Sequence, residues 1–138
     1  MAWSRSVAHG GSGGDEFNDD LTPVIGLAGF NVRSGKYVDA IQPVFLICGN
    51  EEVTGQRHGG GGGDEHQVRF VRGEEIVTVE GRSGKYVDQL TFVTNKKTYG
   101  PYGGNGGKEF QEGQLDGVGG FFGRSGKYLD QVGFFRPC

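Results

Sequence analysis

The sequence predicts an all-β protein in which three similar units surround a pseudo-threefold axis. Three observations support this prediction: one heptapeptide occurs three times, a glycine-rich string precedes each copy, and no segment shows a convincing helical period. The chain has 138 residues, which suits one domain and leaves no room for a second core. We therefore expect a single domain over residues 1–138.

The repeats keep a nearly constant spacing. The heptapeptide reads RSGKYVD at 33–39 and 82–88 and RSGKYLD at 124–130. The glycine-rich string reads HGGSGGDE at 9–16, HGGGGGDE at 58–65 and YGGNGGKE at 102–109. From the first glycine of each string to the Asp of the following heptapeptide there are 29, 29 and 27 residues. The spacing indicates three copies of one unit, at approximately 9–48, 58–100 and 102–138.

Each unit is expected to close with a strand that begins in the heptapeptide. Apolar residues follow the Asp in alternate positions, with Leu90 and Phe92 in the second copy and Val132 and Phe134 in the third. This period of two is typical of a half-buried strand. Ile41 holds the corresponding position in the first copy, and we expect Ile41, Leu90 and Val132 to meet near the axis.

Four further strands are predicted from runs rich in β-branched and aromatic residues, bounded by Gly, Asn and Asp turns. These runs are 23–32, 67–71, 75–80 and 117–122. Short strands without helices are typical of sandwiches, barrels and related closed arrangements. Three equal units favour the three-faced arrangement, with three antiparallel sheets around the axis.

Composition and charge exclude several classes of protein. Gly accounts for 29 residues, but there is no G-X-Y period, and 10 Phe and 5 Tyr argue against a flexible linker. The net charge of −3 provides no basic footprint for nucleic acid and no polybasic membrane anchor. No run of 18 apolar residues occurs, so we expect neither a nucleic-acid partner nor membrane insertion.

Other chemistries of glycine-rich strings fit poorly. The calcium-roll motif needs tandem nine-residue copies, and Lys108 replaces its Asp in the third string. The phosphate-loop pattern fails there too, because Tyr102 and Glu109 occupy its two ends. We therefore expect no metal and no cofactor. Three histidines lack Cys partners and a nucleophile motif, and are expected in loops exposed to water: His9, His58 and His66.

The heptapeptide carries the most informative chemistry. A tight turn at Gly35, Gly84 or Gly126 lets two backbone N–H groups and the carboxylate four positions on converge on one point. Vicinal sugar hydroxyls suit such a pocket, because each can donate to the carboxylate while accepting from an amide. Charge-assisted hydrogen bonds of this kind contribute about 1.5–3 kcal/mol each. The alternative is a plain hairpin turn whose Asp bonds its own loop.

These motifs together resemble those of the jacalin-related lectins, which carry GGxGG near the start of each unit and GxxxD before its last strand. The resemblance covers essentially the whole chain and implies the β-prism I fold, with three four-stranded antiparallel sheets, sugars bound at one end and no enzymatic activity. In that family the first and last strands share a sheet, so the N-terminal glycine loop meets the C-terminal GxxxD. The implied carbohydrate-binding sites are Gly14 with Lys127, Tyr128 and Asp130; Gly63 with Lys36, Tyr37 and Asp39; and Gly107 with Lys85, Tyr86 and Asp88.

The resemblance also implies a role for each residue. The last glycine of the loop, the Lys and the Tyr act through backbone N–H groups, while the Asp accepts two sugar hydroxyls. The Tyr ring is a further candidate for stacking on the sugar. Galactose-specific members are cleaved beside the pocket, whereas the first glycine loop here lies inside a continuous chain. Mannose- or glucose-type glycans, bound multivalently and crosslinked, are therefore the expected partners.

The sequence leaves two other classes of function as alternatives to a lectin. A glycosaminoglycan or anionic-surface binder would use six cations of the Arg-Ser-Gly-Lys turns, namely Arg33, Lys36, Arg82, Lys85, Arg124 and Lys127. Its binding should collapse with rising ionic strength, whereas sugar binding should change little. A glycosidase needs a carboxylate pair across a cleft, but Asp15-Glu16 and Asp64-Glu65 are adjacent residues on loops.

The two cysteines are expected to link chains. Cys48 follows Asp39 by nine residues and Cys138 follows Asp130 by eight, which places them at nearly equivalent points on different sheets. A disulfide needs Cα atoms within about 7 Å. We expect a homodimer joined through Cys48 to Cys138 of a neighbour, with or without an exchanged C-terminal strand, or through Cys138 to Cys138. This implies a secreted protein, although residues 1–14 lack a signal-peptide core, and a reduced cytoplasmic chain is the alternative.

Overall fold

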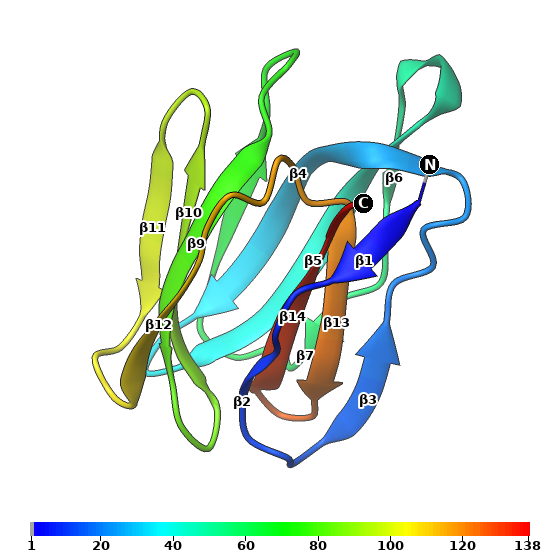
Figure 1. Ribbon diagram of the computed structural model, residues 1–138. Coiled ribbons are helices and arrows are strands. Elements are labelled where there is room, and N and C mark those ends of the chain that lie inside the picture. The colour runs from blue at the N-terminus through cyan, green and yellow to red at the C-terminus, as the bar shows by residue number, and fades with distance from the viewer. Residues whose placement is uncertain (1) are drawn as a thin grey trace.

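The structure, a computed structural model that describes residues 2–138, consists of three antiparallel β-sheets that form the faces of a prism (Figure 1). Sheet 1 contains β1 (Trp3–Arg5), β2 (His9–Gly10), β3 (Asp15–Asn18), β13 (Gly120–Ser125) and β14 (Leu129–Pro137). Sheet 2 contains β4 (Val24–Ser34), β5 (Val38–Ile47), β6 (Glu51–Thr54), β7 (His58–Gly59) and β8 (Asp64–Arg69). Sheet 3 contains β9 (Ile76–Ser83), β10 (Val87–Thr94), β11 (Thr98–Gly103) and β12 (Lys108–Glu112). A single 3-10 turn, η1 (Cys48–Asn50), follows β5.

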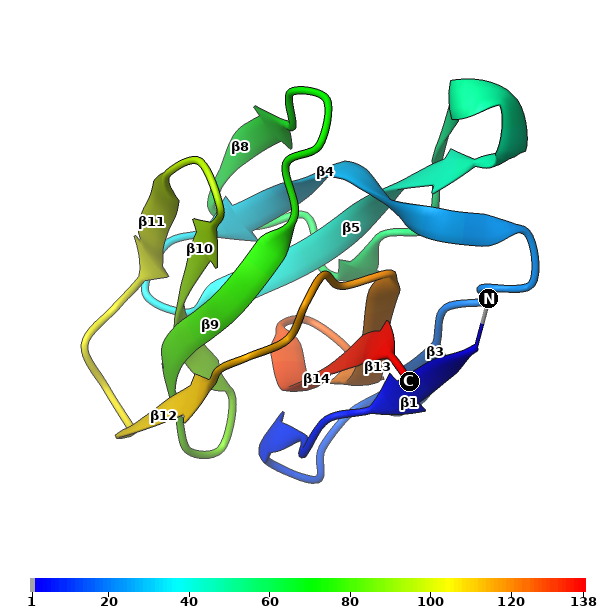
Figure 2. The same ribbon diagram turned by 45° about the horizontal axis from the view of Figure 1, so that its top comes forward.

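Each sheet has four strand positions, as predicted. The strand orders are β1-β14-β13-β3, β6-β5-β4-β8 and β11-β10-β9-β12. In sheets 1 and 2 the strand beside β14 or β5 is broken into two pieces, so β2 and β7 pair with the same neighbours as β1 and β6. Figure 2 shows the N-terminal β1 alongside the C-terminal β14, and Trp3 pairs there with Pro137. The expectation that the chain ends share a sheet is therefore confirmed.

The strands that enter the heptapeptides extend further than the sequence patterns indicated. The runs predicted at 23–32, 75–80 and 117–122 are strands that end at Ser34, Ser83 and Ser125. Each of these serines pairs with the residue just after the turn, as Ser34 does with Val38. The Arg-Ser pair of the heptapeptide therefore belongs to the incoming strand, and the turn itself occupies only the following three residues.

The core lies between the three sheets. Ile41, Leu90 and Val132 are each fully buried, and their strands β5, β10 and β14 each contact the other two. The apolar residues after each heptapeptide therefore meet around the axis, as expected. Among residues 2–138 there is no helix of the length and apolarity that a membrane crossing requires.

Candidate functional site

Three hairpin turns and three glycine loops gather at one end of the prism, at the bottom of Figure 1. We call the three sets of residues named above site 1 (Gly14, Lys127, Tyr128 and Asp130), site 2 (Gly63, Lys36, Tyr37 and Asp39) and site 3 (Gly107, Lys85, Tyr86 and Asp88). In every set the glycine loop comes from one part of the chain and the turn from another, and the edge strand of a shared sheet brings them together.

The glycine loop lies directly against the carboxylate of its Asp. In site 1, a Cβ atom added at Gly14 would lie 2.8 Å from Oδ1 of Asp130, and one added at Gly13 would lie 2.8 Å from Oδ2. The last two glycines of the other loops stand in the same relation to Asp39 and Asp88. The last glycine also has a positive φ of +69° to +72° in all three loops. Only glycine therefore fits these positions without strain.

The three aspartates are largely buried, but their carboxylate oxygens still reach solvent. Asp39, Asp88 and Asp130 are 6%, 7% and 5% exposed. Within residues 2–138, no side-chain hydrogen bond or ion pair joins these carboxylates to the chain, and their oxygens are not among the fully buried polar atoms, so they remain within reach of solvent. The structure therefore gives no support to the simple hairpin interpretation, in which the Asp bonds its own loop. Burial raises the pKa of each carboxyl above its ordinary 3.8, and the positive charge of a nearby arginine offsets this only in part. A largely buried acid with a raised pKa, whose oxygens open to solvent and not to a partner in the chain, is typical of a binding site.

Backbone donors surround each carboxylate. In each turn the N–H of the first glycine donates to the carbonyl of the Tyr two residues on, at 2.9 Å. The backbone N–H groups of the Lys and the Tyr that follow this glycine have no acceptor within the described chain. The same holds for the N–H of the last glycine of the loop. Each site thus combines three unpaired N–H donors with one acceptor carboxylate. Such a site can bind a group that donates and accepts at once, as a hydroxyl does.

The three tyrosine rings of the turns pack against one another. Tyr37, Tyr86 and Tyr128 meet around the axis with ring centroids 4.8 to 5.0 Å apart. The Nζ atom of the preceding lysine lies 5.5 to 5.6 Å from each ring centroid. Each ring therefore packs against two other rings, which differs from the stacking on a sugar that the resemblance suggested.

The prediction that the three histidines lie in loops exposed to water is wrong for His9 and His58. His58 is buried, stacks on Phe17 at 3.9 Å between centroids, and lies 2.6 Å from the carboxylate of Asp19. His9 is half-buried, stacks on Phe110 and contacts Glu112 in the same way. The pairing of β2 with β14 and of β7 with β5 places both histidines at seams between sheets.

His66 is exposed, with its ring 5.1 Å from that of Tyr102. The sequence held a signal for these seams, because each glycine-rich string opens with an aromatic ring and has another eight positions later. Among residues 2–138, no group of three or more His, Cys, Asp or Glu side chains is placed to hold a metal ion.

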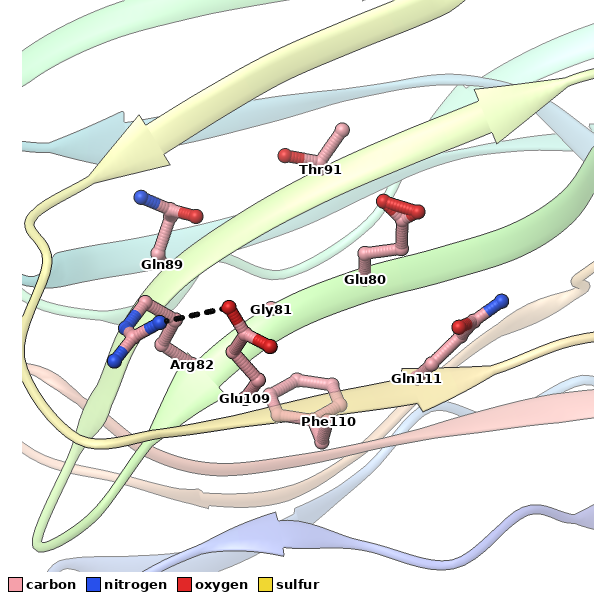
Figure 3. A pocket seen from close by; sticks show the side chains of 8 residues that line it. All are labelled: Glu80, Gly81, Arg82, Gln89, Thr91, Glu109, Phe110 and Gln111. Atoms are coloured by element: carbon pink, nitrogen blue, oxygen red, sulfur yellow. Dashed lines mark hydrogen bonds and ion pairs between the residues drawn. The ribbon is translucent and has the colours of Figure 1, made fainter.

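Beside site 3, the outer face of its sheet carries an open groove of about 490 Å³ (Figure 3). Its lining includes Glu80, Gln89 and Thr91, together with the ion pair between Arg82 and Glu109 at 3.2 Å. The groove lies outside the three aspartate sites, and we assign no role to it.

The two cysteines are exposed and unpaired within the chain. Cys48 begins η1 at the end of β5, and Cys138 follows β14, so they lie at corresponding ends of strands in different sheets, as the repeat predicted.

Comparisons with known proteins agree with this architecture. A Malaysian banana lectin shares 32% sequence identity with the chain over 99% of both, with a TM-score of 0.87. A mannose-specific jacalin-related lectin from Morus nigra, solved in complex with mannose, shares 28% identity over 100% of this chain and 96% of that one, with a TM-score of 0.90. A mannose-binding jacalin-related lectin from Ananas comosus shares 27% identity over 96% of both chains, with a TM-score of 0.88. No curated protein matches the chain significantly. Because the model of the jacalin-like lectin domain matches residues 6–135, the chain belongs to the jacalin-like lectin family of non-enzymatic carbohydrate-binding proteins.

Proposed function

We propose that this lectin binds mannose- or glucose-type glycans at three sites per chain. The observation that supports the proposal is the threefold occurrence of a largely buried aspartate, with its carboxylate open to solvent, beside three N–H groups that have no acceptor in the described chain. The relatives from Morus nigra and Ananas comosus, described as mannose-specific and mannose-binding, support this class of sugar.

The binding step follows from the geometry of site 1. Two neighbouring hydroxyls of the sugar donate to the two carboxylate oxygens of Asp130. Their oxygens accept from the N–H groups of Gly14, Lys127 and Tyr128, which have no other acceptor in the described chain. Sites 2 and 3 act in the same way with their own residues. Part of the desolvation of Asp130 has already occurred on folding, as its raised pKa indicates, so the sugar gains the charge-assisted bonds at a lower cost.

The stoichiometry of binding tests the proposal. We expect calorimetry with a methyl mannoside to give three sugars per chain, each with a dissociation constant near the millimolar range, or about −4 kcal/mol. A branched mannose-rich glycan should bind much more tightly, because the three sites share one end of the molecule. The matched control is a methyl galactoside, which we expect to bind weakly or not at all. A stoichiometry of one would contradict the three-site proposal.

A second candidate, binding to polyanions, has one observation in its favour. Lys36, Lys85 and Lys127 stand around the axis without an ion pair among residues 2–138. The three arginines of the same turns are instead bonded to the glycine loops, which halves the number of available cations. Repeating the titration at high salt separates the two: mannoside binding should persist, whereas heparin binding should disappear.

We propose further that the protein is secreted and forms a covalent homodimer through its thiols. A monomer with all its sites at one end crosslinks glycans poorly, whereas a dimer would present two such ends. Both thiols are exposed, which supports a bond between chains. Non-reducing electrophoresis of protein from its native source should show a dimer that Cys138→Ser converts to monomer. A single monomer band with two free thiols would refute this proposal.

A further inference from the structure

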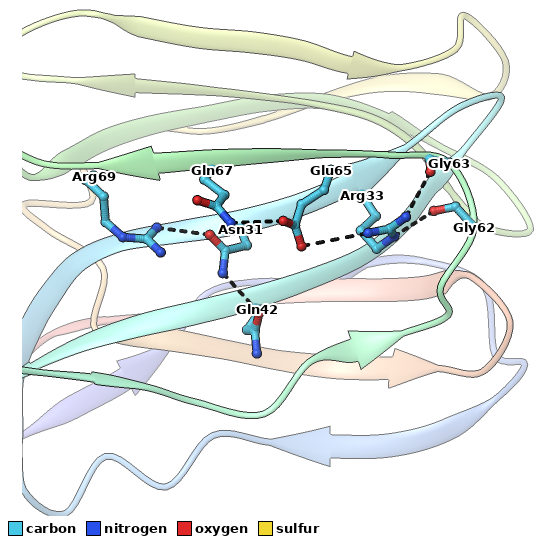
Figure 4. A network of polar contacts seen from close by, with 8 residues as sticks. All are labelled: Asn31, Arg33, Gln42, Gly62, Gly63, Glu65, Gln67 and Arg69. Carbon is cyan, nitrogen blue, oxygen red and sulfur yellow. Dashed lines mark hydrogen bonds and ion pairs between the residues drawn. The ribbon is translucent and has the colours of Figure 1, made fainter.

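The arginine that opens each heptapeptide contacts the glycine loop of the same site. Arg124 donates from Nε to the carbonyl of Gly13 at 3.0 Å and from Nη2 to the carbonyl of Gly14 at 2.8 Å. The same two bonds occur in the other sites. They join Arg33 to Gly62 and Gly63 at 3.0 Å each, and Arg82 to Gly106 and Gly107 at 3.1 and 2.9 Å. Figure 4 shows this contact in site 2.

A glutamate on the facing strand contacts each guanidinium. Nη1 of Arg33 lies 3.7 Å from Glu65, and strand pairing sets the two residues directly opposite each other (Figure 4). The corresponding distances are 3.2 Å from Arg82 to Glu109 and 3.4 Å from Arg124 to Glu16. These exposed ion pairs are weak by themselves. Their effect is to orient the guanidinium, so that its two remaining nitrogens, Nε and Nη2, face the loop.

Because the peptide bond is planar, the contact with the carbonyl also sets the direction of the neighbouring N–H group. In a trans peptide the carbonyl of one residue and the N–H of the next point in opposite directions. When Arg124 holds the carbonyl of Gly13, the N–H of Gly14 must point away from the guanidinium. Gly14 is the loop residue whose N–H has no acceptor in the described chain and at which an added Cβ would lie 2.8 Å from Oδ1 of Asp130. The arginine therefore fixes the direction of the donor that a sugar would use.

Loop composition makes such a restraint necessary. The first loop contains Gly10, Gly11, Gly13 and Gly14, and glycine has the largest backbone freedom of any residue. A free loop would have to be ordered at the moment of binding, which weakens affinity. The GxxxD pattern itself requires only the Gly and the Asp, so the Arg that precedes it in all three copies needs a separate reason.

We infer that Arg33, Arg82 and Arg124 are positioning residues, each of which holds the last two glycine carbonyls of its loop and thereby presents the loop N–H to the glycan. This inference rests on the proposed function. It assigns to each arginine a role in one site only, since each guanidinium contacts one loop.

The test is Arg124→Met, which keeps the length of the stem and removes the donors. Amide NMR resonances of Gly14, Gly63 and Gly107 report sites 1, 2 and 3 separately during a mannoside titration. We expect affinity at site 1 to fall by about tenfold, as the cost of ordering roughly one residue implies, while sites 2 and 3 keep their affinity. Arg124→Lys, which keeps the charge but lacks the planar fork, should restore only part of the affinity.

The matched control is Arg5→Met, on the same sheet. The Arg5 guanidinium bonds Asn18 and lies 4.7 Å from the Phe122 ring centroid, and within residues 2–138 it makes no bond to the glycine loop. The Arg5→Met variant should leave the mannoside affinities of sites 1, 2 and 3 unchanged. Unaltered affinity at site 1 in both Arg124 variants would overturn the inference. If the wild-type protein shows no titration at any site, the proposed function fails instead, and the order parameter of the Gly14 amide, which should fall in Arg124→Met, still decides the positioning role.

Discussion

The triple variant Asp39→Asn, Asp88→Asn and Asp130→Asn is expected to lose all mannoside binding while its fold becomes more stable. Asn has nearly the same shape as Asp but cannot accept two charge-assisted hydrogen bonds from the sugar. Each bond contributes about 1.5–3 kcal/mol, so the loss of both removes most or all of the roughly 4 kcal/mol that a site of millimolar affinity provides. In the unliganded protein, by contrast, the substitution removes a charge that burial disfavours, as the raised pKa of each carboxyl shows.

Calorimetry and thermal unfolding measure both halves of this prediction. Each single Asn variant should reduce the stoichiometry by one, and the melting temperature should rise from wild type to triple variant. Asp64→Asn is the matched control, because Asp64 ends the second glycine loop but is exposed. It should change neither quantity. Mannoside binding by the triple variant would show that the aspartates are not the acceptors.

Local chemistry explains why the turns and strands could be predicted. The RSGKY[VL]D copies contain the turn glycine, and apolar residues follow them at alternate positions. The hairpin and the buried face of its second strand could therefore be predicted from adjacent residues. The pairing of Gly14 with Asp130 was different, because 116 residues of sequence separate them and no local pattern says which loop meets which turn. That pairing came from the resemblance to a family, and the structure places the two residues together.

The arginine contacts could not be predicted for a related reason, and the repeated aromatic positions of the glycine-rich strings did not show which ring or acid would face each histidine. Arg124 bonds Gly13 across a sheet that joins the two ends of the chain, and His58 meets Asp19 across two different sheets. Both contacts depend on sheet pairing and on the angle between sheets. Sequence patterns within one unit contain neither. A prediction of exposed loop histidines fails in this situation because the glycine loop begins at a sheet edge rather than in solvent.

Acidification is expected to abolish mannoside binding before it unfolds the protein. A protonated Asp can accept only one strong hydrogen bond and loses its charge, so affinity should fall as pH drops through the pKa of the three aspartates. Burial raises the pKa of these carboxyls, with Arg33, Arg82 and Arg124 among the charges that oppose the shift. The midpoint should therefore lie above the ordinary value of 3.8 for Asp.

The contribution of these three carboxyls to the stability of the fold should change with pH in the direction opposite to their contribution to binding. Because their pKa values are higher in the folded than in the unfolded chain, the folded state binds more protons, and their contribution to stability rises as pH falls through the folded-state pKa. Binding should thus be lost in a pH range where circular dichroism still reports an intact sheet signal. Restoring neutral pH should restore binding at once. If binding instead persists unchanged until the circular dichroism signal collapses, the aspartates do not titrate in the binding site and the assigned acceptor role must be abandoned.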